Sequence, residues 1–249
     1  MIVSYPHYLD YLITLILFRA GSTDFSRIND PEWHAVGRND YNGDGIADIL
    51  LRSQNTGEWQ IFIMSGGEVS QKSKLSMTGN LNWSIAGDGD FDGDGKGDVL
   101  LRNADGRWYL YYLDGTRIKS TSRPAIPNGL DYTIASTGDD DGDGKTDIIL
   151  RNSDGAWSLF TMNGDDIKCS GQVAIKKSAD WQAIASGDFN GDEIDDLLMR
   201  YKNGKWLVYQ FDGFNVSTPA FRHDRRHGLE DGFNRRLRWR WHHRHPYSQ

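Results

Sequence analysis

Residues 90–98 read DFDGDGKGD. Side chains that carry oxygen stand at the first, third, fifth and ninth positions of this run, and glycines stand at the fourth and sixth. Calcium takes about six to eight oxygen ligands at about 2.3–2.6 Å, and glycine allows the positive φ angles that a tight loop around an ion needs. The run therefore predicts a loop that holds a divalent cation.

Three further runs repeat this pattern. They are DYNGDGIAD from Asp40, DDDGDGKTD from Asp139 and DFNGDEIDD from Asp188, and successive runs begin 50, 49 and 49 residues apart. Internal repetition at about 20–50 residues is typical of propellers and solenoids. A solvated acidic turn without metal is the alternative for any single run, and four evenly spaced copies argue against it.

Each repeat contains the same order of segments around its acidic run. A short β-prone stretch precedes the run and opens with an aromatic residue, as in WSIAG from Trp83. An apolar stretch that ends in arginine follows the run, as in DVLLR to Arg102, and predicts a strand buried on both faces. An Asp-Gly or Asn-Gly dipeptide comes next, as in RNADGRW, and predicts a two-residue hairpin turn. The first repeat reads RSQNTGEW here, and this extra residue explains its interval of 50.

A third strand begins at a tryptophan in every repeat, and more polar segments such as EVSQKSKLS follow as expected outer edge strands. Four short strands per repeat are typical of a propeller blade. We therefore predict an all-β fold, a β-propeller of four four-stranded blades over residues 33–221, with the completeness of the ring left open. The blades begin near residues 33, 83, 132 and 181. The tryptophans are expected in the core, with sugar stacking as the alternative: Trp59, Trp108, Trp157 and Trp206.

The acidic loop, apolar strand and RNxDGxW turn together resemble the FG-GAP/VCBS repeat family, whose calcium-loop blades occur in integrin α-subunit propellers and in bacterial surface and secreted proteins. The resemblance covers residues 33 to about 214. It implies up to four calcium ions, one between the first two strands of each blade. The implied side-chain ligands are Asp40, Asn42, Asp44 and Asp48; Asp90, Asp92, Asp94 and Asp98; Asp139, Asp141, Asp143 and Asp147; Asp188, Asn190, Asp192 and Asp196. The implied backbone carbonyl ligands belong to Ile46, Lys96, Lys145 and Ile194.

Two departures qualify the calcium prediction. An EF-hand loop needs glutamate at position 12, where these loops have leucine or methionine, so we exclude that motif. In the fourth loop Glu193 replaces the glycine at position 6, where a positive φ angle costs a residue with a β-carbon about 1 kcal/mol. We therefore expect the weakest metal site there.

The charge distribution agrees with metal binding. The chain carries a formal charge of −7, but residues 222–249 hold eight arginines and three acids, so residues 1–221 stand at −12. Fourteen of their acids are carboxylates at positions 1, 3, 5 and 9 of the loops, which would repel one another without bound cations. Cys169 is the only cysteine, so no disulfide within one chain is possible.

The two ends of the chain differ from the repeats. Residues 1–32 contain the apolar run YLITLILF, which we interpret as strand material of a preceding blade or as a degraded signal peptide; it is too short to span a bilayer. We interpret residues 222–249 as a fifth repeat that is read out of frame, because one permitted choice of codons, read one nucleotide later, encodes VSTGDFDGDGITDILIR. We therefore expect these residues to be disordered. The alternative is a basic arm that contacts nucleic acid or membrane.

These features favour a non-catalytic calcium-binding module for binding or adhesion to a protein or glycan, which the family resemblance places outside the cell or on its surface. Neither a Ser/His/Asp nor a Cys/His constellation is apparent, because His7 and His34 are the only histidines before the tail. The alternative is a carbohydrate-active enzyme or lectin-like accessory domain with its site on one propeller face. We expect no nucleic-acid partner and no transmembrane segment, and open blade edges could support an oligomer.

Overall fold

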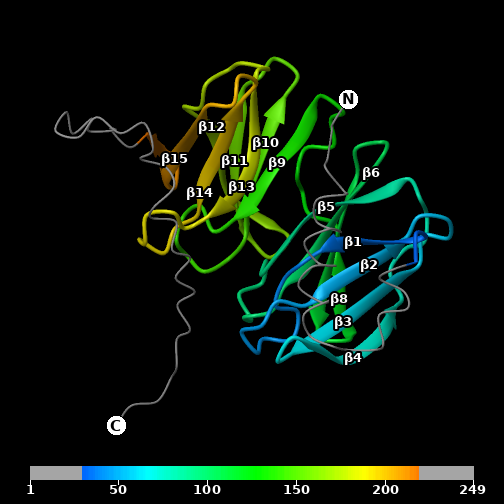
Figure 1. The fold of residues 1–249 in the computed structure, drawn as a ribbon. Helices are drawn as coiled ribbons and strands as arrows, with labels where there is room; N and C mark the ends of the chain where they lie inside the picture. The colour runs from blue at the N-terminus through cyan, green and yellow to red at the C-terminus, as the bar shows by residue number, and fades with distance from the viewer. Residues whose placement is uncertain (1–29, 219–249) are drawn as a thin grey trace, which may run out of the picture. The chain divides into compact units, whose positions relative to one another are not determined.

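The structure is a computed structural model that describes residues 30–218 (Figure 1). The predictions for most of the N-terminal segment and for residues 222–249 lie outside the described residues. Sixteen β-strands and no α-helix form the part of the chain that the structure describes, which confirms the all-β prediction. No helix in that part could therefore cross a membrane.

The strands form four antiparallel sheets, each with its four strands in chain order, so every sheet is one blade. Blade 1 contains β1 (Trp33–Gly37), β2 (Ile49–Ser53), β3 (Trp59–Ser65) and β4 (Glu68–Leu75). Blade 2 contains β5 (Trp83–Gly89), β6 (Asp98–Asn103), β7 (Trp108–Asp114) and β8 (Arg117–Ser122). Blade 3 contains β9 (Tyr132–Gly138), β10 (Asp147–Asn152), β11 (Trp157–Asn163) and β12 (Asp166–Val173). Blade 4 contains β13 (Trp181–Gly187), β14 (Asp196–Tyr201), β15 (Trp206–Asp212) and β16 (Asn215–Ser217).

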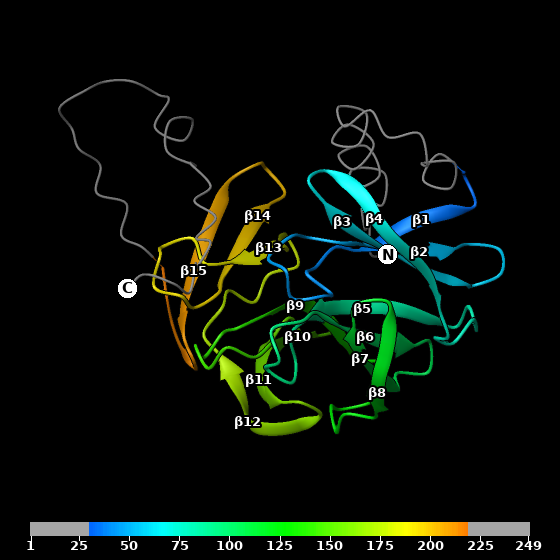
Figure 2. The same ribbon diagram turned by 90° about the horizontal axis from the view of Figure 1, so that it is seen from below.

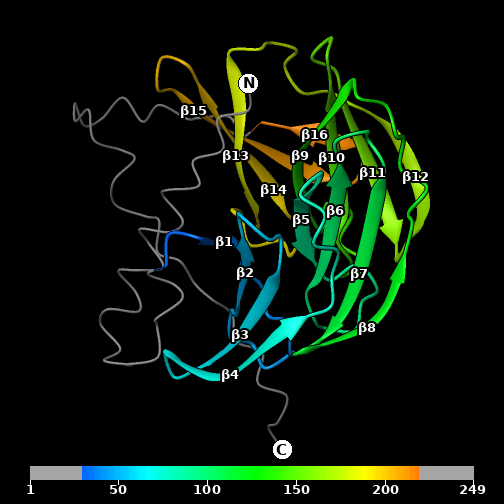
Figure 3. The ribbon, with the colours of Figure 1, turned by 90° about the vertical axis from the view of Figure 1, so that its right-hand side faces the viewer.

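Consecutive blades meet through their first strands, as in a propeller. Strand β5 lies beside β1 on one side and β9 on the other, and β9 in turn lies beside β13 (Figure 2). The later strands of each blade follow outward in order, which Figure 3 shows for β5 to β8 of blade 2. The predicted β-propeller of four four-stranded blades is confirmed.

The hydrophobic core lies between the blades. Leu100 and Leu101 are neighbours in β6 and are both fully buried, yet they belong to different clusters. Leu101 packs in the cluster shared with blade 1, and Leu100 packs with Ile148 and Leu150 of blade 3. This alternation explains the continuous apolar run, since a middle blade buries both of its faces.

The hairpin turns differ from the prediction. A two-residue turn of the predicted kind needs positive φ at both central residues, but only the glycine has it, with a φ angle of 93° at Gly106. The Gly106 N–H donates to the carbonyl of Asn103, and the Asn103 N–H donates to the carbonyl of Arg107. This pattern is a type I turn followed by a glycine bulge, in which Asp105 keeps an ordinary backbone conformation.

In blades 1 to 3 the arginine near the end of the second strand ties its blade to the next one. Arg102 donates from one guanidinium nitrogen to the carbonyl of Tyr132 and from the other to the carbonyl of Gly129, both in the segment that opens blade 3. Its guanidinium carbon lies 4.7 Å from the ring centroid of Trp108, whose indole N–H donates to the carbonyl of Pro127. Arg52 and Arg151 also donate to carbonyls of the following blade. The sequence placed these arginines at strand ends without indicating this role.

Candidate metal-binding loops

The four acidic runs lie in the loops that connect the first and second strands of each blade, as expected. We number them loop 1 (residues 40–48), loop 2 (90–98), loop 3 (139–147) and loop 4 (188–196), and we number positions 1 to 9 within each. Their equivalent location follows from the repeat, because each loop leaves an inner strand and enters a buried one.

The aspartate at position 1 organises each loop. In loop 2, Oδ1 of Asp90 accepts the N–H groups of Gly93 at 2.7 Å and Asp94 at 3.1 Å, and Oδ2 accepts that of Gly95 at 2.7 Å. The aspartates at position 1 of the other loops accept the same three bonds: Asp40, Asp139 and Asp188. The backbone thus curls around this carboxylate, and the glycines at positions 4 and 6 have positive φ angles.

The aspartate at position 9 is buried in every loop. Asp98 accepts the N–H of Phe91 at 3.0 Å and that of Leu113 in β7 at 3.0 Å, so it joins the loop to the third strand. Burial raises the pKa of Asp98 to about 7, although these two bonds act in the opposite direction. The equivalent carboxyls are raised by burial as well, the pKa of Asp147 to about 7 and those of Asp48 and Asp196 to about 6. A buried carboxylate with a raised pKa gains most from a cation beside it.

Positions 3, 5 and 7 complete the loops. Asp94 at position 5 accepts the N–H of Lys96 at position 7 through Oδ1 at 3.0 Å, and the other loops repeat this bond at 2.8 to 3.0 Å between Asp44 and Ile46, Asp143 and Lys145, and Asp192 and Ile194. In loops 1 and 4 the amide nitrogen at position 3, of Asn42 or Asn190, donates to the aspartate at position 5. A metal-binding role for the carbonyls at position 7 remains a prediction.

The carboxylates of two loops converge. Ligand oxygens of Asp90, Asp92 and Asp98 lie within 4.8 Å of one another, and so do those of Asp139, Asp141 and Asp147. This group brings together three of the four predicted side-chain ligands in each of loops 2 and 3. The donors are all oxygen atoms, which suit a hard cation such as Ca²⁺ or Mg²⁺ rather than a soft transition metal. The residues present therefore fit the cation that the family implies.

Loop 4 carries the strain expected from its sequence. Glu193 has a φ angle of 72°, close to the 81° to 83° of the glycines at position 6 in the other loops: Gly45, Gly95 and Gly144. In residues 30–218 it is the only residue other than glycine with a positive φ angle. The loop keeps its shape despite this strain, since the N–H of Glu193 still donates to Oδ2 of Asp188.

Sequence reasoning missed one acidic residue beside these loops. Asp140 stands at position 2 of loop 3, where loops 1 and 2 have the buried aromatics Tyr41 and Phe91. Its carboxyl is fully buried and neither oxygen has a hydrogen-bond partner within the described part of the chain. Burial, followed by the charges of Asp147 and Asp195, raises its pKa well above the usual range. The sequence carried a signal for this residue, because position 2 is aromatic in the other three loops.

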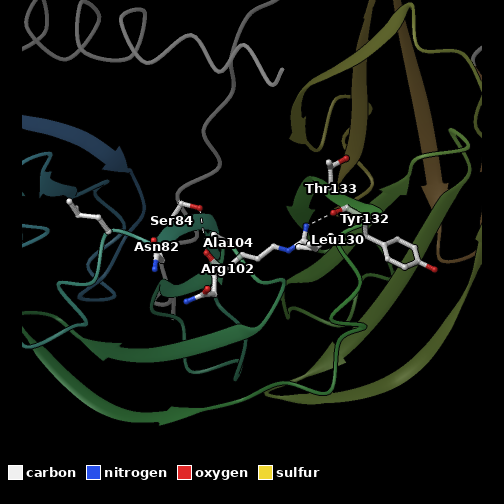
Figure 4. A pocket seen from close by; sticks show the side chains of 9 residues that line it. Asn82, Ser84, Arg102, Ala104, Leu130, Tyr132 and Thr133 are labelled. Atoms are coloured by element: carbon white, nitrogen blue, oxygen red, sulfur yellow. Dashed lines mark hydrogen bonds between the residues drawn. The ribbon is translucent and has the colours of Figure 1, made fainter.

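A pocket of about 440 Å³ with a mixed polar and apolar lining lies between blades 2 and 3 (Figure 4). Its lining includes Asn82, Ser84, Arg102 and Tyr132, and the Arg102 side chain extends from blade 2 toward Tyr132 at the start of blade 3. None of its nine lining residues is an acid, a histidine or a cysteine. The pocket can therefore donate and accept hydrogen bonds, and Tyr132 is the lining side chain of a type that can take part in proton transfer.

Comparison with known families confirms the resemblance. Residues 90–150 and 139–199 each match the family model described as FG-GAP-like repeat. Each matched segment begins at an acidic loop and ends in the second strand of the following blade. No curated protein matches the chain. The two matches together cover residues 90–199, so this part of the chain consists of FG-GAP-like repeats, and the four blades of the structure agree with this family.

Proposed function

We propose that this FG-GAP repeat protein is a non-catalytic β-propeller module that binds calcium in its blade loops and binds a protein or glycan partner outside the cell or at its surface. The observation that carries the proposal is the shared loop scaffold, in which three backbone N–H groups surround the carboxylate at position 1 and a buried carboxylate stands at position 9. Loops 2 and 3 support it most directly, since their carboxylates converge.

Calcium has a structural role in this proposal. When bound, it neutralises the negative charge of the loop carboxylates. The aspartate at position 1 fixes the shape of the loop, and in loops 1 to 3 the aspartate at position 9 holds the loop to the blade, because its carboxylate also accepts an N–H from the third strand. Extracellular calcium modules bind with Kd values of about 10⁻⁴ to 10⁻³ M, which matches loops as exposed as these.

Two observations favour binding over catalysis. The acidic groups recur once per blade, whereas glycoside hydrolysis needs one asymmetric pair of carboxylates. The pocket beside Arg102 lacks any acid, histidine or cysteine in its lining. Its mixed lining of hydrogen-bonding and apolar side chains favours a lectin-like accessory role as the second candidate, with a sugar bound between blades 2 and 3.

Calorimetric titration of the full chain with Ca²⁺, and separately with Mg²⁺, tests the calcium proposal. We expect calcium-selective binding, and loss of one site in each of the variants Asp98→Asn and Asp147→Asn. Asp154→Asn, in an exposed hairpin turn, is the control and should bind as the unmodified chain does. Absent binding, or equal stoichiometry in all four proteins, would overturn the proposal. A glycan array probed with the calcium-loaded chain, and with Asn82→Ala as the pocket variant, tests the second candidate.

A further inference from the structure

Two lysines bridge the carboxylates of loops 2 and 3 as a cation would. The ammonium of Lys119 in β8 lies 2.8 Å from Oδ2 of Asp92 and 2.8 Å from Oδ2 of Asp94, at positions 3 and 5 of loop 2. The corresponding groups of blade 3 share this arrangement at 2.9 and 2.5 Å: Lys168 with Asp141 and Asp143.

The lysines take the oxygens that the loop backbone leaves available. Oδ1 of Asp92 accepts the N–H of Asp94 at 3.3 Å, and Oδ1 of Asp94 accepts the N–H of Lys96 at 3.0 Å. The remaining oxygens are the two Oδ2 atoms that Lys119 bonds. A metal ion bound through these same two oxygens would have to displace the ammonium.

The backbone directs Lys119 toward the loop. Leu113 pairs with Ile118 and Tyr112 pairs with Ser120, so Lys119 is an extra residue in a β-bulge between β7 and β8. A bulge re-aims the side chain of the extra residue relative to a regular strand. Lys168 occupies the same bulge position between β11 and β12. The contact therefore recurs in blades 2 and 3 on the same backbone feature.

The other two blades lack both halves of this pair. Loops 1 and 4 have asparagine at position 3, and its amide donates to the aspartate at position 5 at 3.0 Å in loop 1 and 2.7 Å in loop 4. Serine replaces the lysine, as Ser70 in blade 1 and Ser217 in blade 4. The four carboxylates of loop 2 with one ammonium thus carry the same net charge as the three carboxylates of loop 1. At the position of Lys119 and Lys168 in the repeat, lysine is present only in the blades whose loop has an aspartate at position 3.

We propose that Lys119 and Lys168 are tethered counter-cations that compete with Ca²⁺ for positions 3 and 5 of loops 2 and 3. The inference rests on the proposed calcium binding. Each lysine stabilises its loop when calcium is scarce and weakens calcium binding when calcium is present. Loops 1 and 4, without a lysine, depend on the metal alone to neutralise their carboxylates.

Site-resolved calcium titration by NMR of the full chain tests this competition. The backbone amides of Gly45, Gly95 and Gly144 each donate to the position 1 aspartate of their own loop, so their signals report loops 1, 2 and 3 separately. In Lys119→Ser we expect loop 2 to bind calcium more tightly, with the Ca²⁺ concentration at half saturation (the midpoint) about tenfold lower. This is the factor expected from losing two ion pairs of favourable geometry. The midpoints of loops 1 and 3 should stay unchanged.

Ser70→Lys supplies the reciprocal variant, because Ser70 occupies the bulge position of blade 1. It should weaken calcium binding in loop 1 by a similar factor, and more so when combined with Asn42→Asp. Lys74→Ser is the matched control, since Lys74 pairs with Glu58 away from any loop.

The outcomes separate this inference from the proposed function. An unchanged or weakened loop 2 in Lys119→Ser, with the unmodified chain binding normally, would overturn the competition alone. Absence of any calcium response in all three glycine signals of the unmodified chain would overturn the proposed function and this inference together.

Discussion

Trp157 and Trp206 begin the third strands of blades 3 and 4 at the same position of the repeat, yet Trp157 is 1% exposed and Trp206 is 39% exposed. The indole of Trp157 donates to the carbonyl of Lys176, and Arg151 donates to the carbonyl of Trp181, the first residue of blade 4. No blade follows blade 4 within residues 30–218. Burial of this tryptophan is therefore a property of the next blade and not of the repeat that contains it.

The loops show the same dependence. The carbonyl of Asp139 in loop 3 accepts the N–H of Asp195, and that of Asp140 accepts the N–H of Gly213, both in blade 4. Loops 1 and 2 receive the equivalent two bonds from blades 2 and 3. Within the described residues, loop 4 receives neither. A neighbouring blade thus completes each loop as well as each core.

The largest test of this comparison replaces the two tryptophans. Trp157→Ala should lower the free energy of unfolding by about 3–5 kcal/mol, because it leaves a cavity between blades 3 and 4. Trp206→Ala should cost about 1 kcal/mol, since this side chain is partly in contact with water. Urea unfolding monitored by circular dichroism measures both, and equal losses would break the comparison.

The arginines provide the second test. Arg102→Ala removes two charge-assisted hydrogen bonds to blade 3 and should cost about 2–3 kcal/mol. Arg200→Ala removes an exposed side chain that stacks over Trp206 with its guanidinium carbon 5.4 Å from the ring centroid, and it should cost about 0.5 kcal/mol. The same unfolding measurement applies, and a larger loss in Arg200→Ala would contradict the role of the arginine between blades.

Asp140 tests whether the boundary between blades 3 and 4 carries an electrostatic cost. Asp140→Asn removes the charge while keeping the shape, and it should raise the free energy of unfolding by about 1–3 kcal/mol at neutral pH. The folded-state pKa of Asp140 lies above that of the unfolded chain, so its carboxylate costs stability as pH rises. The gain should therefore shrink toward acidic pH. Phe91→Asp, at the equivalent position of loop 2, should show the opposite sign, and a destabilised Asp140→Asn would contradict this account.

Glu193 gives the smallest expected effect. Glu193→Gly relieves the positive φ angle in loop 4 and should raise stability by about 1 kcal/mol, with tighter calcium binding at that loop. Gly144→Glu places the same strain in loop 3 and should lose a similar amount. Thermal unfolding of both variants measures the effect, and no difference between them would remove strain as the cause of a weak fourth site.

The repeat pattern predicted what each blade contains. The acidic loops, the apolar second strands and the tryptophans of the third strands gave four blades and the position of every loop. Interactions between blades were not predictable in the same way, because they join residues such as Arg102 and Tyr132 that share no local pattern. The hairpin turns were misjudged since Asp-Gly fits two turn types, and the bonds of Asn103 distinguish them only in three dimensions. Lys119 had a readable signal, the pairing of lysine with aspartate at position 3, which becomes meaningful only once the bulge is known.

A thermal melt of the full chain in EDTA, then with millimolar Ca²⁺ and with Mg²⁺ as the comparison, tests the central claim most directly. A ligand that binds the folded state stabilises it by RT ln(1 + [L]/Kd). The account predicts a melting temperature that rises with Ca²⁺, saturates, and responds less to Mg²⁺. A sharp melt at the same temperature in EDTA and in calcium would leave the propeller in place and contradict calcium as the ion that its loops bind.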